Sequence, residues 1–248
     1  MRAAIKETYS VEFDDIDQFN SLNLFGLGRY IQNISIHHTE ELGFGYYKNN
    51  GKKPQYYWVL SRVKYVLKEP VNWRDNFSIN TYIGGFHKLF TVKLYDIEDY
   101  TGKKIGYVIA DYILMDVDKG RPIKAIEISE DAPDDFKFNY TGEVLEKLKI
   151  PTRIMAQEIR KAYYSELDMN GHMNNVEYIK WIVDILPEEV QQEKVIESLQ
   201  INYNASVMYQ DEVRIIAEQE DENTYYVAGV SRDGKKNHFT SKLILRDH

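Results

Sequence analysis

The sequence contains no cysteine among its 248 residues. Disulfides, a thiolate nucleophile and thiolate metal sites are therefore excluded. The sequence also has no apolar run long enough to cross a bilayer, and its first stretch, MRAAIKETYSVEF, lacks the apolar core of a signal peptide. We expect a cytoplasmic protein that does not insert into a membrane.

Basic residues are in the minority: 31 Lys and Arg stand against 39 Asp and Glu, for a formal net charge of −8. Nucleic-acid binding needs a basic surface that neutralises phosphates, so we expect no nucleic-acid partner. An acidic protein partner is excluded less firmly, because a local basic patch can coexist with an acidic total. The 43% of hydrophobic residues is ordinary for a globular protein with one large domain or two small ones.

Aromatic and β-branched residues are plentiful, with 20 Tyr and 10 Phe. They gather in runs that turn residues separate, a pattern typical of strands. The runs predict strands over 8–13, 56–67, 76–83, 89–97, 104–115, 156–164, 195–203, 212–219, 224–231 and 238–245. Apolar residues at helical spacing predict two main helices, over 27–42 and 176–186.

The order of elements in the first half repeats in the second. VNWRDNF at 71–77 aligns with VMYQDEV at 207–213, GKK at 102–104 aligns with GKK at 234–236, and Tyr30 aligns with Tyr178. We interpret this as a duplicated unit of strand, helix and several strands. The predicted fold class is α+β, with each helix wrapped by an antiparallel sheet.

An acidic, Pro-containing stretch separates the halves. We predict an N-terminal unit over 1–132, a linker over 133–152 and a C-terminal unit over 153–248. Gly142 and Pro151 bracket a piece of the linker, 143–149, whose composition predicts a short helix.

A polar turn precedes the second helix, in the stretch DMNGHMNNVEYIKWIVDIL at 168–186. Asn174 or Asn175 is a natural N-cap for the helix. Polar groups at a helix N-terminus favour a substrate oxygen that becomes negative during reaction. The alternative is that Asp168 and Asn170 only cap and form the turn. The spacing of the remaining histidines does not suit a metal site, so we expect none. We predict solvated or packed side chains for these histidines: His37, His38, His87, His238 and His248.

Taken together, these residues resemble a known family. The stretch 168–178 is similar to the D-x-N-x-H-x-N-N-x-x-Y signature of the acyl-acyl carrier protein thioesterases, which have a tandem double hotdog fold. First-half segments resemble the family as well: WVLSR at 58–62, Pro70 with Trp73, TY at 81–82 and YILMD at 112–116. The resemblance implies hydrolysis of the thioester that joins a fatty acyl chain to the phosphopantetheine arm of acyl carrier protein, in fatty acid biosynthesis. Water is the co-substrate, and no cofactor is implied.

The resemblance implies a role for each residue of the turn. Asp168, Asn170 and His172 match catalytic positions, and we assign Asn174, Asn175 and Ser206 to substrate binding. An imidazole can be neutral near pH 7, so His172 can activate water. Asp168 is placed to orient His172, and Asn170 to position the water or polarise the carbonyl. Backbone N–H groups near Asn174 are further candidate oxyanion donors.

The sequence departs from the family at Ser206, within INYNASV at 201–207, where the family commonly carries a catalytic Glu. Either Asp168 and His172 carry water activation, or the activity is low; Ser206 as a covalent nucleophile is a further alternative. The first-half counterpart of the turn, DQFNSLNLFG at 17–26, lacks His. We therefore predict that the first unit is catalytically silent and shapes the acyl pocket.

Two other functions stay open at the level of sequence. One is a hotdog thioesterase that acts on acyl-CoA, and the other is a non-catalytic acyl-binding protein of the same fold. A homodimer is also left open.

Overall fold

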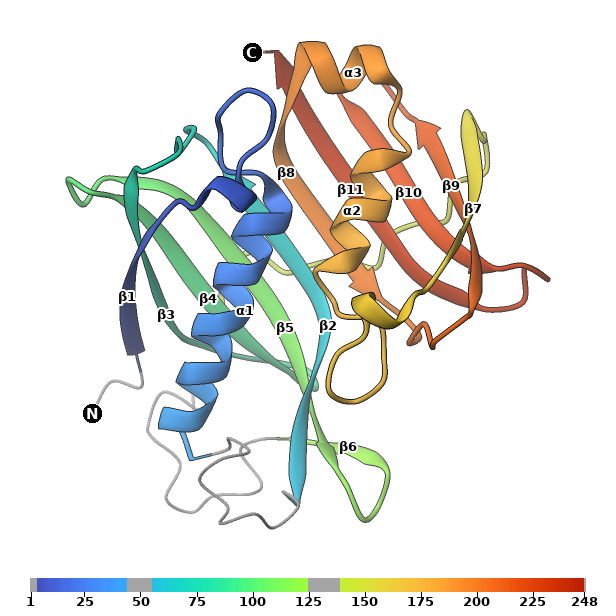
Figure 1. The fold of residues 1–248 in the computed structure, drawn as a ribbon. Helices are drawn as coiled ribbons and strands as arrows, with labels where there is room; N and C mark the ends of the chain where they lie inside the picture. Colours follow the sequence, from blue (N-terminus) through green and yellow to red (C-terminus); the bar gives the residue numbers. More distant parts are fainter. Residues whose placement is uncertain (1–3, 44–54, 125–138, 248) are drawn as a thin grey trace. The chain divides into compact units, whose positions relative to one another are not determined.

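The computed structural model describes residues 4–43, 55–124 and 139–247 (Figure 1). The chain folds into two compact units, Met1–Leu145 and Glu146–His248. The bounds of the linker predicted over 133–152 stay a prediction.

The first unit is an antiparallel sheet with one long helix. Its sheet has the strand order β1-β3-β4-β5-β2, and β6 pairs with β5. Its elements are β1 (Ala4–Ser10), the short 3₁₀ helix η1 (Phe13–Asp15), α1 (Leu24–Glu41), β2 (Tyr56–Leu67), β3 (Asn76–His87), β4 (Phe90–Asp99), β5 (Lys104–Asp116) and β6 (Arg121–Ile123).

The second unit repeats this plan with a shorter central helix. Its sheet has the strand order β8-β11-β10-β9-β7, and these pairs are also antiparallel. Its elements are β7 (Ala156–Lys161), the 3₁₀ helix η5 (Tyr164–Glu166), α2 (Glu177–Asp184), α3 (Glu188–Glu193), β8 (Lys194–Tyr203), β9 (Glu212–Gln219), β10 (Thr224–Ser231) and β11 (Asn237–Asp247).

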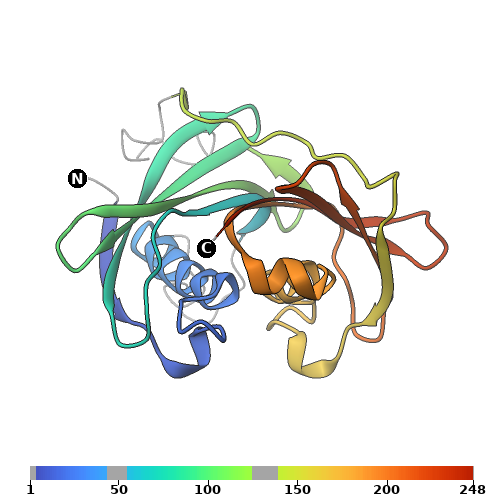
Figure 2. The ribbon, with the colours of Figure 1, turned by 90° about the horizontal axis from the view of Figure 1, so that it is seen from above.

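Each helix packs an apolar face against its own sheet. In α1 the buried face includes Leu27, Ile31 and Ile34, and in α2 it includes Trp181 and Ile182. Side chains alternate between the two faces of each strand, and the apolar ones on the inner face pack against the helix. In Figure 2 the sheet of each unit curves around its own helix. The predicted fold class is confirmed: two tandem hotdog units, each a helix wrapped by an antiparallel sheet.

Most predicted strands form, and three of them, over 56–67, 212–219 and 224–231, have the predicted bounds. The first strand is wrong in position, because β1 ends at Ser10 and η1 begins at Phe13. Both helices also differ from their predicted bounds: α1 begins three residues earlier, and α2 ends at Asp184. The short elements α3 and β6 were not predicted.

The helix predicted over 143–149 is wrong, since this stretch has no regular secondary structure. A helix needs its carbonyl groups for bonds along its own axis. Here the Leu145 carbonyl accepts from the Arg62 guanidinium, and the Glu146 carbonyl accepts from the side-chain amides of Gln200 and Asn202, each at 2.9 Å. Side chains of the sheets therefore take the acceptors that a helix would use.

Within the described residues, no helix is both long enough and apolar enough to span a membrane.

Candidate active site in the second unit

The turn between η5 and α2 is closed by the carboxylate of Asp168. One oxygen, Oδ1, accepts from the backbone N–H of Asn170 at 2.8 Å and from that of His172 at 3.2 Å. The Asp168 N–H in turn donates to the His172 carbonyl at 2.7 Å. Asp168 therefore fixes the main chain of His172, and the structure brings Asp168, Asn170 and His172 together in one turn.

Gly171 lies at the crest of this turn with φ +76°, a left-handed conformation that favours glycine. Its N–H donates to the Asp168 carbonyl at 3.0 Å. Asn170 is exposed and its side-chain amide donates to Asp168 Oδ2 at 3.4 Å, whereas His172 is half-buried. The amide and the imidazole thus stand at the edge of the unit, where a substrate can reach them.

The segment that carries Ser206 runs beside the turn. The Met173 N–H donates to the Val207 carbonyl at 2.9 Å, and His172 forms an isolated β-bridge with Met208. The Val207 N–H donates to the Tyr178 hydroxyl at 3.2 Å. Both polar groups of Val207 are therefore held, and Ser206 next to it is placed near the turn with an exposed side chain.

Tyr178 ties the helix to this segment. Burial raises the pKa of Tyr178 to about 12, so its hydroxyl stays protonated while it accepts from Val207. Its ring packs edge-on against Tyr203 and Phe239, with ring centroids 5.3 Å apart in both pairs. Tyr178 belongs to the signature, but this role could not be predicted, because nothing in the spacing shows which backbone group the hydroxyl meets.

His238 holds the same segment from the other end. Its Nδ1–H donates to the carbonyls of Ala205 and Ser206, both at 3.2 Å. Burial lowers the pKa of His238, which favours the neutral imidazole. His238 is thus a packed histidine, one of the two environments predicted for it, and it fixes the backbone at Ala205 and Ser206.

The two asparagines of the signature are occupied by backbone contacts. The Asn174 N–H donates to the Glu166 carbonyl at 2.8 Å and is engaged in the turn. Oxyanion donation by the N–H groups near it stays a prediction. The Asn174 side chain accepts from the Val176 N–H at 3.1 Å, and Val176 itself is the N-cap of α2 without a side-chain cap. The Asn175 carbonyl accepts from the Tyr203 hydroxyl at 2.8 Å. Neither asparagine caps the helix as predicted.

The first unit contains the same turn on an equivalent backbone. Asp17 Oδ1 accepts from the N–H groups of Phe19 at 2.9 Å and Ser21 at 3.0 Å, and the Asp17 N–H donates to the Ser21 carbonyl at 2.8 Å. The Leu22 N–H donates to the Val71 carbonyl at 2.7 Å, as Met173 does to Val207. The predicted equivalence of 17–26 with the polar turn is confirmed. Phe19 and Ser21 stand where the second unit has Asn170 and His172.

This register corrects the alignment of the two helices. The Tyr30 hydroxyl donates to Asp15 Oδ2 at 2.6 Å, and the Trp181 Nε1–H donates to Glu166 Oε1 at 3.2 Å. The counterpart of Tyr30 is therefore Trp181, and the alignment of Tyr30 with Tyr178 was wrong. The same offset in numbering relates Asp17 to Asp168 and Tyr30 to Trp181, so the alignment of the two turns already contained this pairing. A phenol and an indole both place a hydrogen-bond donor at the ring edge, which lets them fill the same role.

In the part of the chain that the structure describes, no three His, Asp or Glu side chains gather in a group that could hold a metal ion. The site is thus built from a carboxylate, an amide and an imidazole on a turn, with a tyrosine and a histidine that hold the neighbouring segment.

Two family models match the chain. The acyl-ACP thioesterase N-terminal domain matches residues 2–132, and the acyl-ACP thioesterase C-terminal domain matches residues 151–243. The oleoyl-acyl carrier protein thioesterase of Coriandrum sativum, named as chloroplastic, is 23% identical over 92% of this chain and 66% of its own length. The chain spans between 50% and 66% of the length of the curated relatives it matches. The cytoplasmic location stays a prediction.

Solved structures share the fold over nearly the whole chain. An acyl-ACP thioesterase from Bacteroides thetaiotaomicron superposes with a TM-score of 0.84 and 27% identity, covering 98% of both chains. The 12:0-ACP thioesterase from Umbellularia californica superposes with a TM-score of 0.86 and 16% identity, covering 99% of this chain and 98% of that one.

Fold and turn together define a tandem hotdog protein with one polar turn per unit. With both domain models matched in order along the chain, the protein belongs to the acyl-ACP thioesterase family.

Proposed function

We propose that this protein hydrolyses the thioester between a fatty acyl chain and acyl carrier protein, releasing free fatty acid in fatty acid biosynthesis. The observation that carries the proposal is the difference between two equivalent turns. Both have the same backbone bonds, but only the second places an amide and an imidazole, Asn170 and His172, on that frame. Family membership supports the same reaction class.

In the proposed reaction His172 takes a proton from a water molecule, whose oxygen attacks the thioester carbon. The Asn170 amide donates to the carbonyl oxygen as that oxygen becomes negative. Collapse of the tetrahedral intermediate breaks the carbon–sulfur bond, and the departing phosphopantetheine thiolate takes the proton from His172. Asp168 acts as a positioning residue, through the His172 main chain that it holds. The first unit takes no part in the chemistry and shapes the acyl pocket.

The test is thiol release from acyl carrier protein thioesters by the purified full chain. We expect His172→Ala to lower kcat by about 10²–10⁴-fold, the usual effect of losing a general base. Ser21→Ala, the change at the equivalent position of the first unit, is the matched control and should leave the rate unchanged. Equal rates for the wild type and His172→Ala would remove His172 from the mechanism.

The same assay distinguishes between acyl carrier protein and CoA thioesters as the substrate. At matched concentrations the acyl carrier protein thioester should be cleaved faster than the corresponding acyl-CoA. The reverse preference would assign the chain to the acyl-CoA thioesterases.

One observation favours a second candidate function, a non-catalytic acyl-binding protein. Ser206 stands where the family commonly carries Glu, and its exposed side chain leaves room for a longer one. If water activation is limited by the missing carboxylate, Ser206→Glu should raise kcat by about 10²-fold. Tight acyl binding without turnover in the wild type, together with turnover in Ser206→Glu, would establish the binding function. An unchanged rate in an active enzyme would show that Asp168 and His172 suffice.

A further inference from the structure

Lys93 on β4 is buried in the first unit, with 4% of its surface exposed. Its ammonium group donates to the Ser35 carbonyl at 2.9 Å and to the Ser35 hydroxyl at 3.0 Å, both on α1. Buried lysines ordinarily pair with a carboxylate. Among the described residues no carboxylate pairs with Lys93. Two of its three N–H donors are therefore used, and the third has no protein acceptor there.

The acidic residue on the neighbouring strand does not neutralise this charge. Asp111 on β5 pairs with Val92, whereas Lys93 pairs with Ala110. Successive side chains of a strand point to opposite faces, so Asp111 lies on the face away from α1 and Lys93 on the face toward it. The Lys93 ammonium instead faces two aromatic rings, Tyr95 and Tyr112, each with its centroid 5.9 Å away.

Lys93 also lines a pocket of this unit that encloses about 270 Å³ of space, part of it open to solvent. The lining combines apolar side chains with hydroxyl groups: Thr39, Leu42, Trp58, Ile83, Thr91 and Tyr112 complete it. The Thr39 hydroxyl donates to the Ser35 carbonyl at 2.8 Å, so its oxygen can still accept. A chain that enters this pocket thus meets an apolar wall, an N–H donor and hydroxyl acceptors.

We propose that this pocket takes an acyl chain that carries a hydroxyl group, with Lys93 donating to the hydroxyl oxygen. The inference rests on the proposed function, in which the first unit shapes the acyl pocket. The hydroxyl proton has acceptors in Thr39 and Thr91, and the apolar lining holds the methylene groups around it. Burial lowers the pKa of Lys93 to about 7, so the ammonium form, which has the third N–H for the hydroxyl oxygen, prevails below about pH 7.

The test compares acyl carrier protein thioesters of one chain length that differ only in a hydroxyl, placed at successive positions along the distal half of the chain. We expect one position at which the wild type cleaves the hydroxyacyl substrate with kcat/KM about tenfold above the plain chain, because a site built to bind a hydroxyl penalises its absence. In Lys93→Met this ratio should fall about tenfold. The readout is a ratio, so a general loss of stability does not move it.

Two further variants keep the test decisive. Lys104→Met removes an exposed lysine of β5 and should change neither rate. Thr91→Val, nearly isosteric, should lower the ratio and serves if Lys93→Met fails to fold. No hydroxyl preference in the wild type, a preference that survives both pocket variants, or a stronger preference for a carboxyl-terminated chain would overturn the proposal. Failure of the proposed function is recognised separately, as no release of thiol from either substrate.

Discussion

At the residue scale, Asp168 shows how one side chain serves a turn and a site together. Its Oδ1 closes the turn by accepting two backbone N–H groups, and Asp17 makes the same pair of bonds where no imidazole or amide follows. The turn-forming role therefore does not depend on catalysis. What is particular to Asp168 is the residue whose main chain it holds, His172.

Replacing each aspartate by alanine separates the two roles. Asp168→Ala and Asp17→Ala should each lower the free energy of unfolding by about 1–2 kcal/mol, since each leaves two N–H groups without their carboxylate. Only Asp168→Ala should also lower kcat, because it frees the main chain of His172. Chemical denaturation and thiol release measure the two effects on the same preparations.

Asp168→Asn refines this comparison, because the amide oxygen can still accept both N–H groups. A rate close to the wild type would limit Asp168 to positioning. A rate as low as that of Asp168→Ala would mean that its negative charge acts on the imidazole directly.

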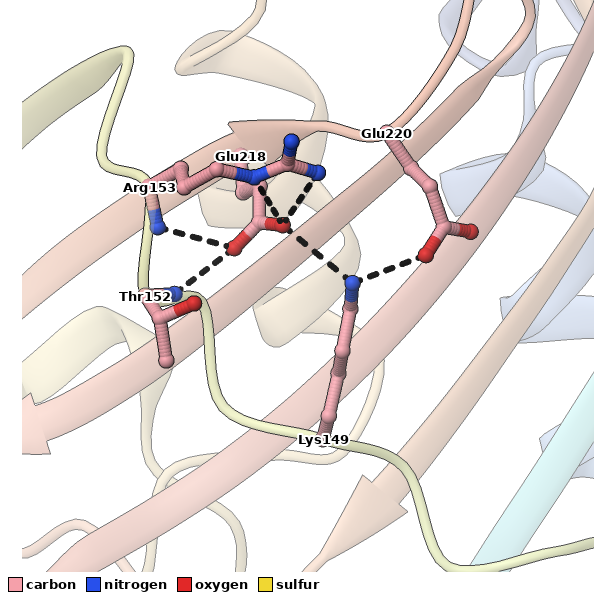
Figure 3. Close-up of polar contacts among 5 residues, drawn as sticks. All are labelled: Lys149, Thr152, Arg153, Glu218 and Glu220. Carbon is pink, nitrogen blue, oxygen red and sulfur yellow. Dashed lines mark hydrogen bonds and ion pairs between the residues drawn. The ribbon is translucent and has the colours of Figure 1, made fainter.

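At the scale of elements, the stretch 149–153 is fastened to β9 by one buried carboxylate (Figure 3). Glu218 is 1% exposed and accepts from the N–H groups of Thr152 at 2.6 Å and Arg153 at 3.0 Å. Lys149 reaches the same carboxylate at 3.2 Å and Glu220 at 2.8 Å. These partners keep the segment extended along the sheet.

The charge of Glu218 predicts acid sensitivity. The Thr152 and Arg153 N–H groups, then Lys149, lower the pKa of Glu218 to about 2, below its ordinary value of 4.5. A carboxyl group whose pKa is lowered by folding stabilises the folded state above its unfolded pKa. Its contribution is complete above about pH 4.5 and is lost as the pH falls toward about 2.

Glu218→Gln should therefore unfold more readily than the wild type at pH 7, and the difference should shrink between about pH 4.5 and 2. Thermal unfolding across this range measures it. Glu220→Gln, on the exposed side of the same lysine, is the control and should have a smaller effect. Parallel curves for the wild type and Glu218→Gln would show that Glu218 contributes nothing through its charge.

At the scale of the whole molecule, the two units share the backbone of the turn and differ in the side chains on it. The turns of the two units share their backbone bonds, but the helices begin differently. Asn23 caps α1, its side chain accepting from the Gly26 N–H at 2.7 Å, whereas Asn174 bonds two residues ahead and α2 begins only at Glu177. The two units therefore differ in how the helix starts after the turn. They also differ in two side chains of the turn, with Phe19 in place of Asn170 and Ser21 in place of His172.

This difference predicts that placing an amide and an imidazole on the turn of the first unit will not make that unit catalytic. Adding Phe19→Asn and Ser21→His to His172→Ala should leave kcat within about twofold of His172→Ala, because a site also needs its supporting residues. Thiol release measures the rate. Recovery toward the wild-type rate would show that the shared backbone is sufficient and that the first unit can be catalytic.

Alternation, turn residues and motif spacing are local properties of the chain, and they were enough to predict the strand pattern, the duplication and the turn. Long-range contacts set the other features. They leave 143–149 without a helix, since Arg62, Gln200 and Asn202 take the carbonyls that a helix would use. They also bury Lys93 against α1, and through them Tyr178 and His238 hold the segment beside His172. These outcomes depend on partners far away in the sequence, and local patterning carries no record of which donor will meet which acceptor.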